Sequence, residues 1–193
     1  AFSVFMLGLQ ERLAIEQPDQ VLFIARDGYL FQQLWQSSAE PLANQYVYLS
    51  RQVIAAASVA QGLTLQQSQV AFYNPKQQGL RSICKVYSLP EEEFVDLAQQ
   101  LGWHDSTVPL HDWHDTRLLA WLADERVQTR VRYYGQQHKD ALEGYLTQIG
   151  FFNAKKTALV DIGWNGTLQH FLQRTFGLRS DYPQVRGYYF ALV

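Results

Sequence analysis

The sequence predicts an α/β fold with a mostly parallel sheet, because short apolar strands alternate with amphipathic helices at both ends of the chain. Apolar runs at 21–25 and 157–160 each lead into an aspartate and then a glycine, which is typical of a buried strand followed by a helix start. Between them, residues 62–115 contain no convincing parallel strand. We therefore expect a Rossmann-like sheet with a helical lobe inserted between its strands.

The first part of the chain predicts two of the strands. Phe5, Leu9 and Leu13 recur near helical spacing, and Pro18 then ends this first helix. Two short apolar or aromatic runs follow, each long enough for one strand, with a further helical pattern between them. In chain order, we expect helix 2–15, strand 21–25, helix 28–36, strand 46–50 and helix 53–61.

The middle and the end of the chain predict the helical lobe and the return of the α/β pattern. Pro90 followed by three glutamates marks a helix start, because acidic side chains favour the positive end of a helix. Val127, Val131 and Leu142 lie on one stripe of a long helix that Gly150 can end. We expect helices at 80–89, 90–101, 124–149 and 167–176, a loop at 103–115, and strands at 157–161 and 185–192.

These elements predict two regions in the chain. Residues 1–61 and 151–193 are expected to form the α/β core, and residues 62–150 are expected to form the inserted helical lobe. The chain begins without Met and stops inside the apolar run 187–193. We therefore expect it to be a fragment of a larger multidomain protein.

Composition narrows the classes of function. The 193 residues carry a formal net charge of -2, which disfavours a general nucleic-acid binder but allows a local basic pocket. The single cysteine, Cys84, excludes an internal disulfide and a multi-cysteine zinc site, and it favours a reducing compartment. No apolar run reaches the ~18 residues of a membrane span. We therefore expect a cytoplasmic location, and the inner face of the membrane is one place within the cytoplasm where the chain could act.

Charged and polar side chains follow three of the expected strands. The carboxyl ends of parallel strands meet at one edge of a sheet, where ligands bind in open α/β folds. Backbone N–H groups at a helix start attract phosphate, and carboxylates can hold sugar hydroxyls or a metal ion. The candidate site residues are Arg26, Asp27 and Gly28 after the first strand, Ser50 and Arg51 after the second, and Asp161, Gly163, Trp164, Asn165, Gly166 and Thr167 after the third.

Each candidate also has a purely structural interpretation. Asp27 and Asp161 can cap the helices that follow them, and the two arginines can face water. Trp164 can pack against the lobe instead of stacking on a sugar. In the segment 103–115, the spacing of His111 and His114 suits a metal, but the pattern there favours an irregular loop.

Four segments together point to a known family. They lie in matching order and span most of the chain: FIARDGYLF (23–31), YLSR (48–51), ALVDIGWNGTLQ (158–169) and RGYYFAL (186–192). They resemble a bacterial polysaccharide-biosynthesis family that pairs a haloacid-dehalogenase-like (HAD-like) phosphatase domain with a second domain. The chain is similar to that second domain, the glycan phosphoribosyltransferase domain of dual-domain ribofuranosyltransferases.

The resemblance implies a glycosyltransferase that moves phosphoribose from phosphoribosyl pyrophosphate to a hydroxyl of a growing glycan, such as O-antigen. On this hypothesis Asp161 holds the ribose, and the loop 163–167 holds the 5-phosphate. Arg26 or Arg51 binds the pyrophosphate, and Asp27 holds Mg²⁺ or takes the acceptor proton. The partner phosphatase domain, which would remove the 5-phosphate, would lie outside this chain or on another protein.

The chain departs from the phosphoribosyltransferase pattern at one position, and two other functions remain as alternatives. Familiar phosphoribosyltransferases carry an acidic pair where this chain has Asp161 and Ile162. A HAD-like sugar-phosphate phosphatase needs a nucleophilic aspartate two residues before an acid/base aspartate, and Ala25 precedes Asp27 instead. Similarly, Gly163 stands where a second acid would follow Asp161. A non-catalytic sugar-binding module of a polysaccharide-assembling enzyme is the other alternative, because five Trp, eleven Tyr and eleven Phe suit carbohydrate stacking as readily as a core.

Overall fold

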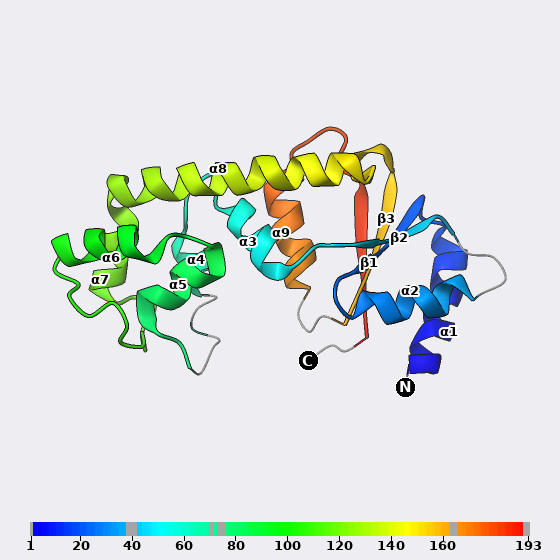
Figure 1. Cartoon of the computed structure of the whole chain (residues 1–193), viewed down its shortest axis with the longest axis horizontal. Coiled ribbons are helices and arrows are strands. Elements are labelled where there is room, and N and C mark those ends of the chain that lie inside the picture. The colour runs from blue at the N-terminus through cyan, green and yellow to red at the C-terminus, as the bar shows by residue number, and fades with distance from the viewer. Residues whose placement is uncertain (1, 38–41, 70–71, 73–75, 163–165, 191–193) are drawn as a thin grey trace. The chain divides into compact units, whose positions relative to one another are not determined.

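The computed structural model describes residues 2–37, 42–69, 72, 76–162 and 166–190. It contains a four-stranded, all-parallel sheet with helices between its strands (Figure 1), which confirms the expected α/β class. The chain forms two compact units, Ala1–Arg51 with Glu143–Val193, and Gln52–Leu142, which we call the sheet unit and the helical unit. The expected division into a core of 1–61 and 151–193 and a lobe of 62–150 stays a prediction about domains.

The strand order of the sheet unit is β2-β1-β3-β4, and each neighbouring pair is parallel. β1 therefore lies beside β3, although the helical unit separates the two strands in sequence. The elements of this unit are α1 (Phe2–Glu16), β1 (Gln20–Ile24), α2 (Gly28–Gln36), β2 (Asn44–Val47), the 3-10 turn η2 (Phe151–Asn153), β3 (Lys156–Asp161), α9 (Thr167–Phe176) and β4 (Gln184–Tyr189).

Both faces of the sheet are covered by helices, which explains why the middle of each central strand, 21–24 in β1 and 158–160 in β3, is apolar. Val21 and Phe23 of β1 face α1 and α2. Leu22 and Ile24 alternate with them on the other face of the strand and are also buried. The core on the first face consists of Met6, Leu9, Leu13, Val21, Phe23, Phe31, Trp35, Ala158 and Val160.

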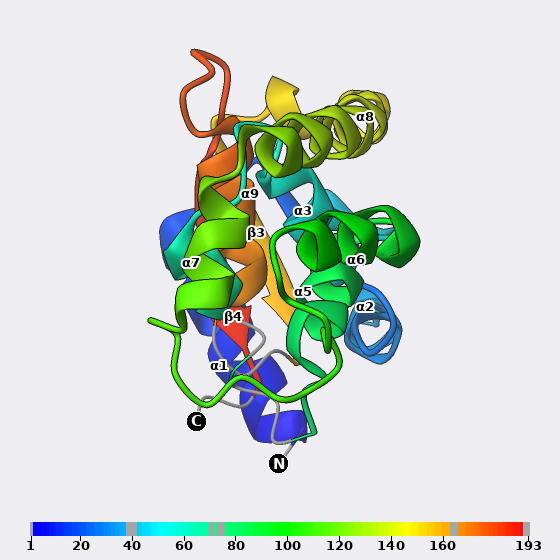
Figure 2. The ribbon, with the colours of Figure 1, turned by 90° about the vertical axis from the view of Figure 1, so that its left-hand side faces the viewer.

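The helical unit packs around buried aromatic side chains. Phe94 and Trp121 meet edge to face with ring centroids 5.8 Å apart, and the Trp121 indole N–H donates to the Phe94 carbonyl at 3.4 Å. α5 and α6 pack against each other, as Figures 1 and 2 show. The helices of this part are α3 (Arg51–Ser58), α4 (Leu65–Ser68), α5 (Gly79–Tyr87), α6 (Glu91–Gln100), α7 (Thr116–Ala123) and α8 (Glu125–Gln148), with the ends of α3 and α8 in the sheet unit.

Several elements differ from the expectation, including the short helix α4, which was not expected, and the last strand, which was expected at 185–192 and forms β4 at Gln184–Tyr189. The second strand ends at Val47, not at residue 50, because β1 ends at Ile24 and offers no partner beyond it. The helix expected at 53–61 spans 51–58 instead. The sequence reading missed α7, whose start Asp115 caps by accepting a hydrogen bond from the Arg117 N–H at 2.9 Å.

The His- and Asp-rich segment 103–115 uses its acids for local structure. Asp105 accepts hydrogen bonds from the hydroxyl and the N–H of Thr107, and these bonds lower the pKa of Asp105. Asp115 pairs with Arg117, which lowers the pKa of Asp115. Trp103 is fully buried and anchors the segment. In the helical unit, Cys84 is also buried, and burial raises its pKa to about 12, so this thiol is unreactive at neutral pH.

Gly28 allows the start of α2 to approach β1 closely. A Cβ atom at Gly28 would lie 2.7 Å from the backbone carbonyl carbon of Phe23. We predict that Gly28→Ala destabilises the chain by about 1–3 kcal/mol, as overpacking does. Gly8 of α1 is the matched control, because a Cβ there meets no atom within 4 Å. Gly8→Ala should stabilise by about 0.5–1 kcal/mol through helix propensity. Urea unfolding tests both, and equal effects of the two variants would contradict the prediction.

Glu16 ties the end of α1 to β4. Its carboxylate accepts a hydrogen bond from the Tyr188 hydroxyl at 2.5 Å and pairs with Arg186. The Tyr188 hydrogen bond is the main cause of the lowered pKa of Glu16, whose unperturbed value is 4.5. A carboxylate whose pKa is lower in the folded than in the unfolded chain stabilises the fold at pH values above its unfolded-state pKa. This stabilisation is lost as the pH falls through the folded-state pKa.

We therefore predict that Glu16→Gln lowers the free energy of unfolding at pH 7, by less than about 1 kcal/mol because the pair is near the surface. The difference from the wild type should shrink once the pH falls below 4.5. Urea titrations at pH 7 and at lower pH measure it. Glu11→Gln, at an exposed position of the same helix, is the control. A difference that stays constant with pH would count against the role given to Glu16.

Candidate functional site

The candidate site lies where β1 and β3 end next to each other. β1 leads through α2 to β2 on one side, and β3 leads through α9 to β4 on the other side. This divergence is a topological switch point, and it leaves a crevice at the carboxyl edge of the sheet. A pocket of about 550 Å³ occupies this place, and the described residues that line it all belong to the sheet unit. Its volume is in the range of small-molecule sites.

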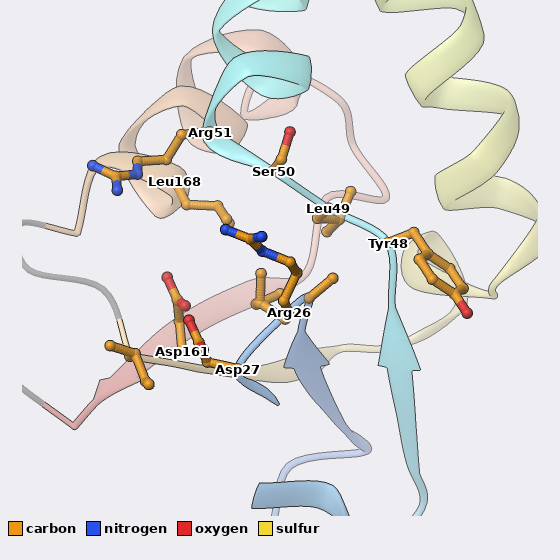
Figure 3. Close-up of a pocket in the computed structure, with 11 residues that line it drawn as sticks. Arg26, Asp27, Tyr48, Leu49, Ser50, Arg51, Asp161 and Leu168 are labelled. Atoms are coloured by element: carbon orange, nitrogen blue, oxygen red, sulfur yellow. The ribbon is translucent and has the colours of Figure 1, made fainter. Parts of the chain in front are cut away.

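Two carboxylates from neighbouring strand ends point into the pocket (Figure 3). Asp161 is the last residue of β3 and is half-buried, and its carbonyl accepts a hydrogen bond from the Phe190 N–H at 3.1 Å. Asp27 stands at the N-cap of α2, yet its side chain makes no capping hydrogen bond. The N-cap of α9 is Gly166 and not Asp161. Helix capping therefore does not account for either carboxylate.

Two arginines line the same pocket. In Figure 3 the guanidinium group of Arg26 points toward the same space as the carboxylates, and Arg51 borders that space from the start of α3. In the described part of the chain neither arginine forms an ion pair, whereas Arg179 and Arg186 of the same unit each pair with a glutamate. A guanidinium group matches phosphate oxygens in a planar, two-point contact. Arg26 and Arg51 are therefore suited to an anionic ligand.

The charge of Asp161 also acts on β4. Tyr189 pairs in register with Asp161, and its hydroxyl donates to the Gln169 side-chain oxygen at 3.3 Å. Burial raises the pKa of Tyr189, and the nearby negative charge of Asp161 raises it further. Tyr189 thus stays protonated and neutral beside the carboxylate at ordinary pH. The site therefore combines a negative region at the strand ends with positive guanidinium groups on its border.

Carboxylate oxygens of this pocket suit Mg²⁺. Magnesium is commonly held by one or two carboxylates together with phosphate oxygens of a substrate, rather than by a cage made of protein alone. Asp27 and Asp161 offer such oxygens from two strand ends of one pocket. The residues present therefore fit this metal, with Asp27 as the more exposed ligand.

The structure brings five of the predicted site residues to this pocket, namely Arg26, Asp27, Ser50, Arg51 and Asp161. The Ser50 hydroxyl points away from both carboxylates in Figure 3. Gly28 does not line the pocket and instead packs against β1. Gly166 and Thr167 begin α9, directly before the pocket residue Leu168. The predicted residues Gly163, Trp164 and Asn165 lie outside the described residues.

Sequence reasoning missed the other side chains of the pocket. Tyr48 and Leu49 precede Ser50 where the chain leaves β2, and both line the pocket. Tyr48 carried no clear signal, because the strand expected at 46–50 put it in mid-strand, whereas β2 ends at Val47 and leaves Tyr48 at the ligand-binding edge. The apolar lining residues carried no signal either, since they read as ordinary core; they are Ile24, Ala25, Leu49, Ile162 and Leu168.

Comparisons with known proteins leave the family open. No protein-family model matches the chain, and no curated protein matches it. Among the helices that the structure describes, none is both long enough and apolar enough to cross a membrane. The resemblance to ribofuranosyltransferases therefore stays a hypothesis, which the sequence segments and the geometry of the site have to support.

Proposed function

We propose that this chain is a glycosyltransferase that moves phosphoribose from phosphoribosyl pyrophosphate to a glycan hydroxyl in surface-polysaccharide biosynthesis. One observation carries the proposal: two carboxylates and two guanidinium groups line one pocket at the switch point of a parallel sheet. A phosphoribosyl donor presents hydroxyl groups and phosphates in one small molecule, and so calls for both kinds of group. The segments that resemble ribofuranosyltransferases contain all four of these residues.

The proposed reaction exchanges one bond at C1 of the ribose. The acceptor oxygen forms a bond to C1 while the bond from C1 to the pyrophosphate oxygen breaks, and that electron pair leaves with the pyrophosphate. Positive charge builds on the ribose ring in the transition state, and in this proposal the half-buried carboxylate of Asp161 holds the ribose hydroxyls and stabilises this charge. Asp27 either takes the proton of the acceptor hydroxyl or ligates the metal.

The phosphates of the donor have separate partners in this proposal. Arg26 or Arg51 binds the pyrophosphate, because both line the pocket and neither has an ion-pair partner within the described residues. Gly166 is the N-cap of α9, a helix of ten residues that begins at Thr167, and its first N–H groups suit the 5-phosphate. Mg²⁺, when bound, would neutralise charge on the leaving pyrophosphate.

The proposal also names a partner and a place. The 5-phosphate would stay on the transferred ribose, so a phosphatase has to remove it, and the family resemblance assigns this step to a HAD-like domain. That domain would lie outside this chain or on another protein. We place the reaction in the cytoplasm, which includes the inner face of the membrane.

We predict that Asp27→Asn and Asp161→Asn each lower turnover by at least about tenfold, the scale of a lost general base or charge contact. Pyrophosphate release from phosphoribosyl pyrophosphate with Mg²⁺ and a mixed glycan acceptor fraction measures this. Asp96→Asn, at an exposed position of α6, is the control and should keep full activity. Near-normal turnover in both site variants would defeat the assignment of the two carboxylates.

We further predict that Arg26→Gln or Arg51→Gln weakens donor binding by about tenfold or more, since a hydrogen bond to a charged group contributes about 1.5–3 kcal/mol. Calorimetry with phosphoribosyl pyrophosphate and Mg²⁺, at low and high salt, measures the loss. Arg174→Gln, at an exposed position of α9, is the control.

Assays of activity and of binding also distinguish the transferase from the alternative functions. Phosphate release from sugar phosphates that is abolished by Asp161→Asn would instead favour a phosphatase. Saccharide binding by a chain that neither binds nor turns over the donor would favour a non-catalytic module. A preference for nucleotide sugars over phosphoribosyl pyrophosphate would overturn the proposed donor.

A further inference from the structure

Three tyrosine rings form a continuous surface beside the pocket. Tyr29 of α2, Tyr46 of β2 and Tyr48 after β2 meet edge to face, with ring centroids 5.8 Å apart for the first pair and 5.3 Å apart for the second. The outer residues are exposed, Tyr29 by 57% and Tyr48 by 73%, while Tyr46 packs partly against the core. We call these three residues the tyrosine ladder.

The tyrosine ladder reaches the candidate site at one end. Tyr48 lines the pocket that also contains Asp27 and Asp161. In Figure 3 the Tyr48 ring points away from the two carboxylates. The aromatic surface therefore begins at the border of the pocket and extends outward along the sheet edge formed by β2.

The exposed rings are held on fixed backbone. The Tyr48 N–H donates to the Tyr145 hydroxyl at 2.8 Å, and Tyr145 belongs to the part of α8 inside the sheet unit. The Tyr29 N–H, in the first turn of α2, donates to the Arg26 carbonyl at 3.3 Å. A surface whose backbone is already ordered loses less conformational entropy when a ligand binds. The ladder therefore has the preorganisation of a binding surface.

Fold stability alone does not explain the outer rings. An aromatic side chain stabilises a fold mainly through the apolar area that it removes from water, and Tyr48 keeps 73% of its surface exposed. Neighbouring exposed aromatic side chains form an apolar patch, and such patches mark interaction sites when they are contiguous. The position of Tyr48 in the pocket lining connects this patch to the proposed chemistry.

We infer that the tyrosine ladder binds the acceptor glycan. A sugar ring has apolar C–H faces and a border of hydroxyl groups, and tyrosine offers an apolar ring face with a polar tip. Sugar units stacked along Tyr29 and Tyr48 would lie beside the pocket that contains Asp27 and Asp161, with Tyr48 at its border. The inference rests on the proposed function for one point only, that the saccharide bound here is the acceptor.

The test is an NMR titration of the whole chain carrying ¹³C-labelled tyrosine rings. The probes are four neutral hexasaccharides: cellohexaose, maltohexaose, hexa-N-acetylchitohexaose and mannohexaose. We expect at least one of them to shift the ring signals of Tyr29 and Tyr48. Tyr48→Ala should weaken this binding by about tenfold, as expected when an interface tyrosine is truncated. Tyr133→Ala is the matched control, because Tyr133 is 59% exposed and its ring lies 5.1 Å from that of Tyr134 in the helical unit.

The inference would be overturned by the absence of any shift of Tyr29 or Tyr48 with the four saccharides, or by equal loss of binding in Tyr48→Ala and Tyr133→Ala. Shifts caused by a mononucleotide but by no saccharide would also overturn it. If Tyr48→Ala does not fold, Tyr29→Ala and Tyr48→Leu provide the same comparison.

Donor calorimetry on the wild type separates this failure from failure of the proposed function. Binding of phosphoribosyl pyrophosphate without any saccharide shift would leave the transferase proposal standing and remove the ladder from it. Saccharide shifts at the ladder without donor binding would keep the ladder as a saccharide site and defeat the transferase proposal.

Discussion

The pairing of β1 with β3 is the constraint on which the candidate site depends. Asp27 and Asp161 are far apart in sequence, and they share a pocket because the two central strands end at one edge of the sheet. Register matters as much as pairing. Side chains alternate between the faces of a strand, so a slip of one residue would move Asp161 from the side of Leu159 to the side of Val160, which faces α1 and α2. The pocket would then lose one of its two carboxylates.

Anchors at the opposite end of the same strands hold this register. The carboxylate of Asp19, just before β1, accepts hydrogen bonds from the N–H groups of Lys155 and Lys156 at 2.7 and 2.8 Å, and these bonds lower its pKa. The amide group of Gln20 donates to the Thr157 hydroxyl at 2.9 Å in a buried position. These contacts join the starts of β1 and β3 within the sheet unit. The position of Asp161 is therefore fixed by contacts between the starts of β1 and β3, and not by the path of the chain through the helical unit.

The local sequence pattern was sufficient to predict the features that depend on residues adjacent in the chain. The apolar runs of β1 and β3, and the acids that follow them, could be read from the sequence because burial and strand period are local signals. The end of β2 at Val47 could not be read, because it depends on where its partner β1 stops. Tyr48 was overlooked for a similar reason: its backbone is held by Tyr145, and no local pattern reports a contact between two distant segments.

The two proposed ligands would be selected by different physical forces at one sheet edge. The proposed donor is highly charged, so its phosphates would be recognised by Arg26 and Arg51, whose attraction for anions weakens as salt screens it. A neutral acceptor offers little to those charges and much to an aromatic surface, and stacking on Tyr48 depends little on ionic strength. Because Tyr48 lines the charged pocket, the two surfaces meet at a single residue. A donor and an acceptor of such different chemistry can therefore occupy adjacent places without competing for the same contacts.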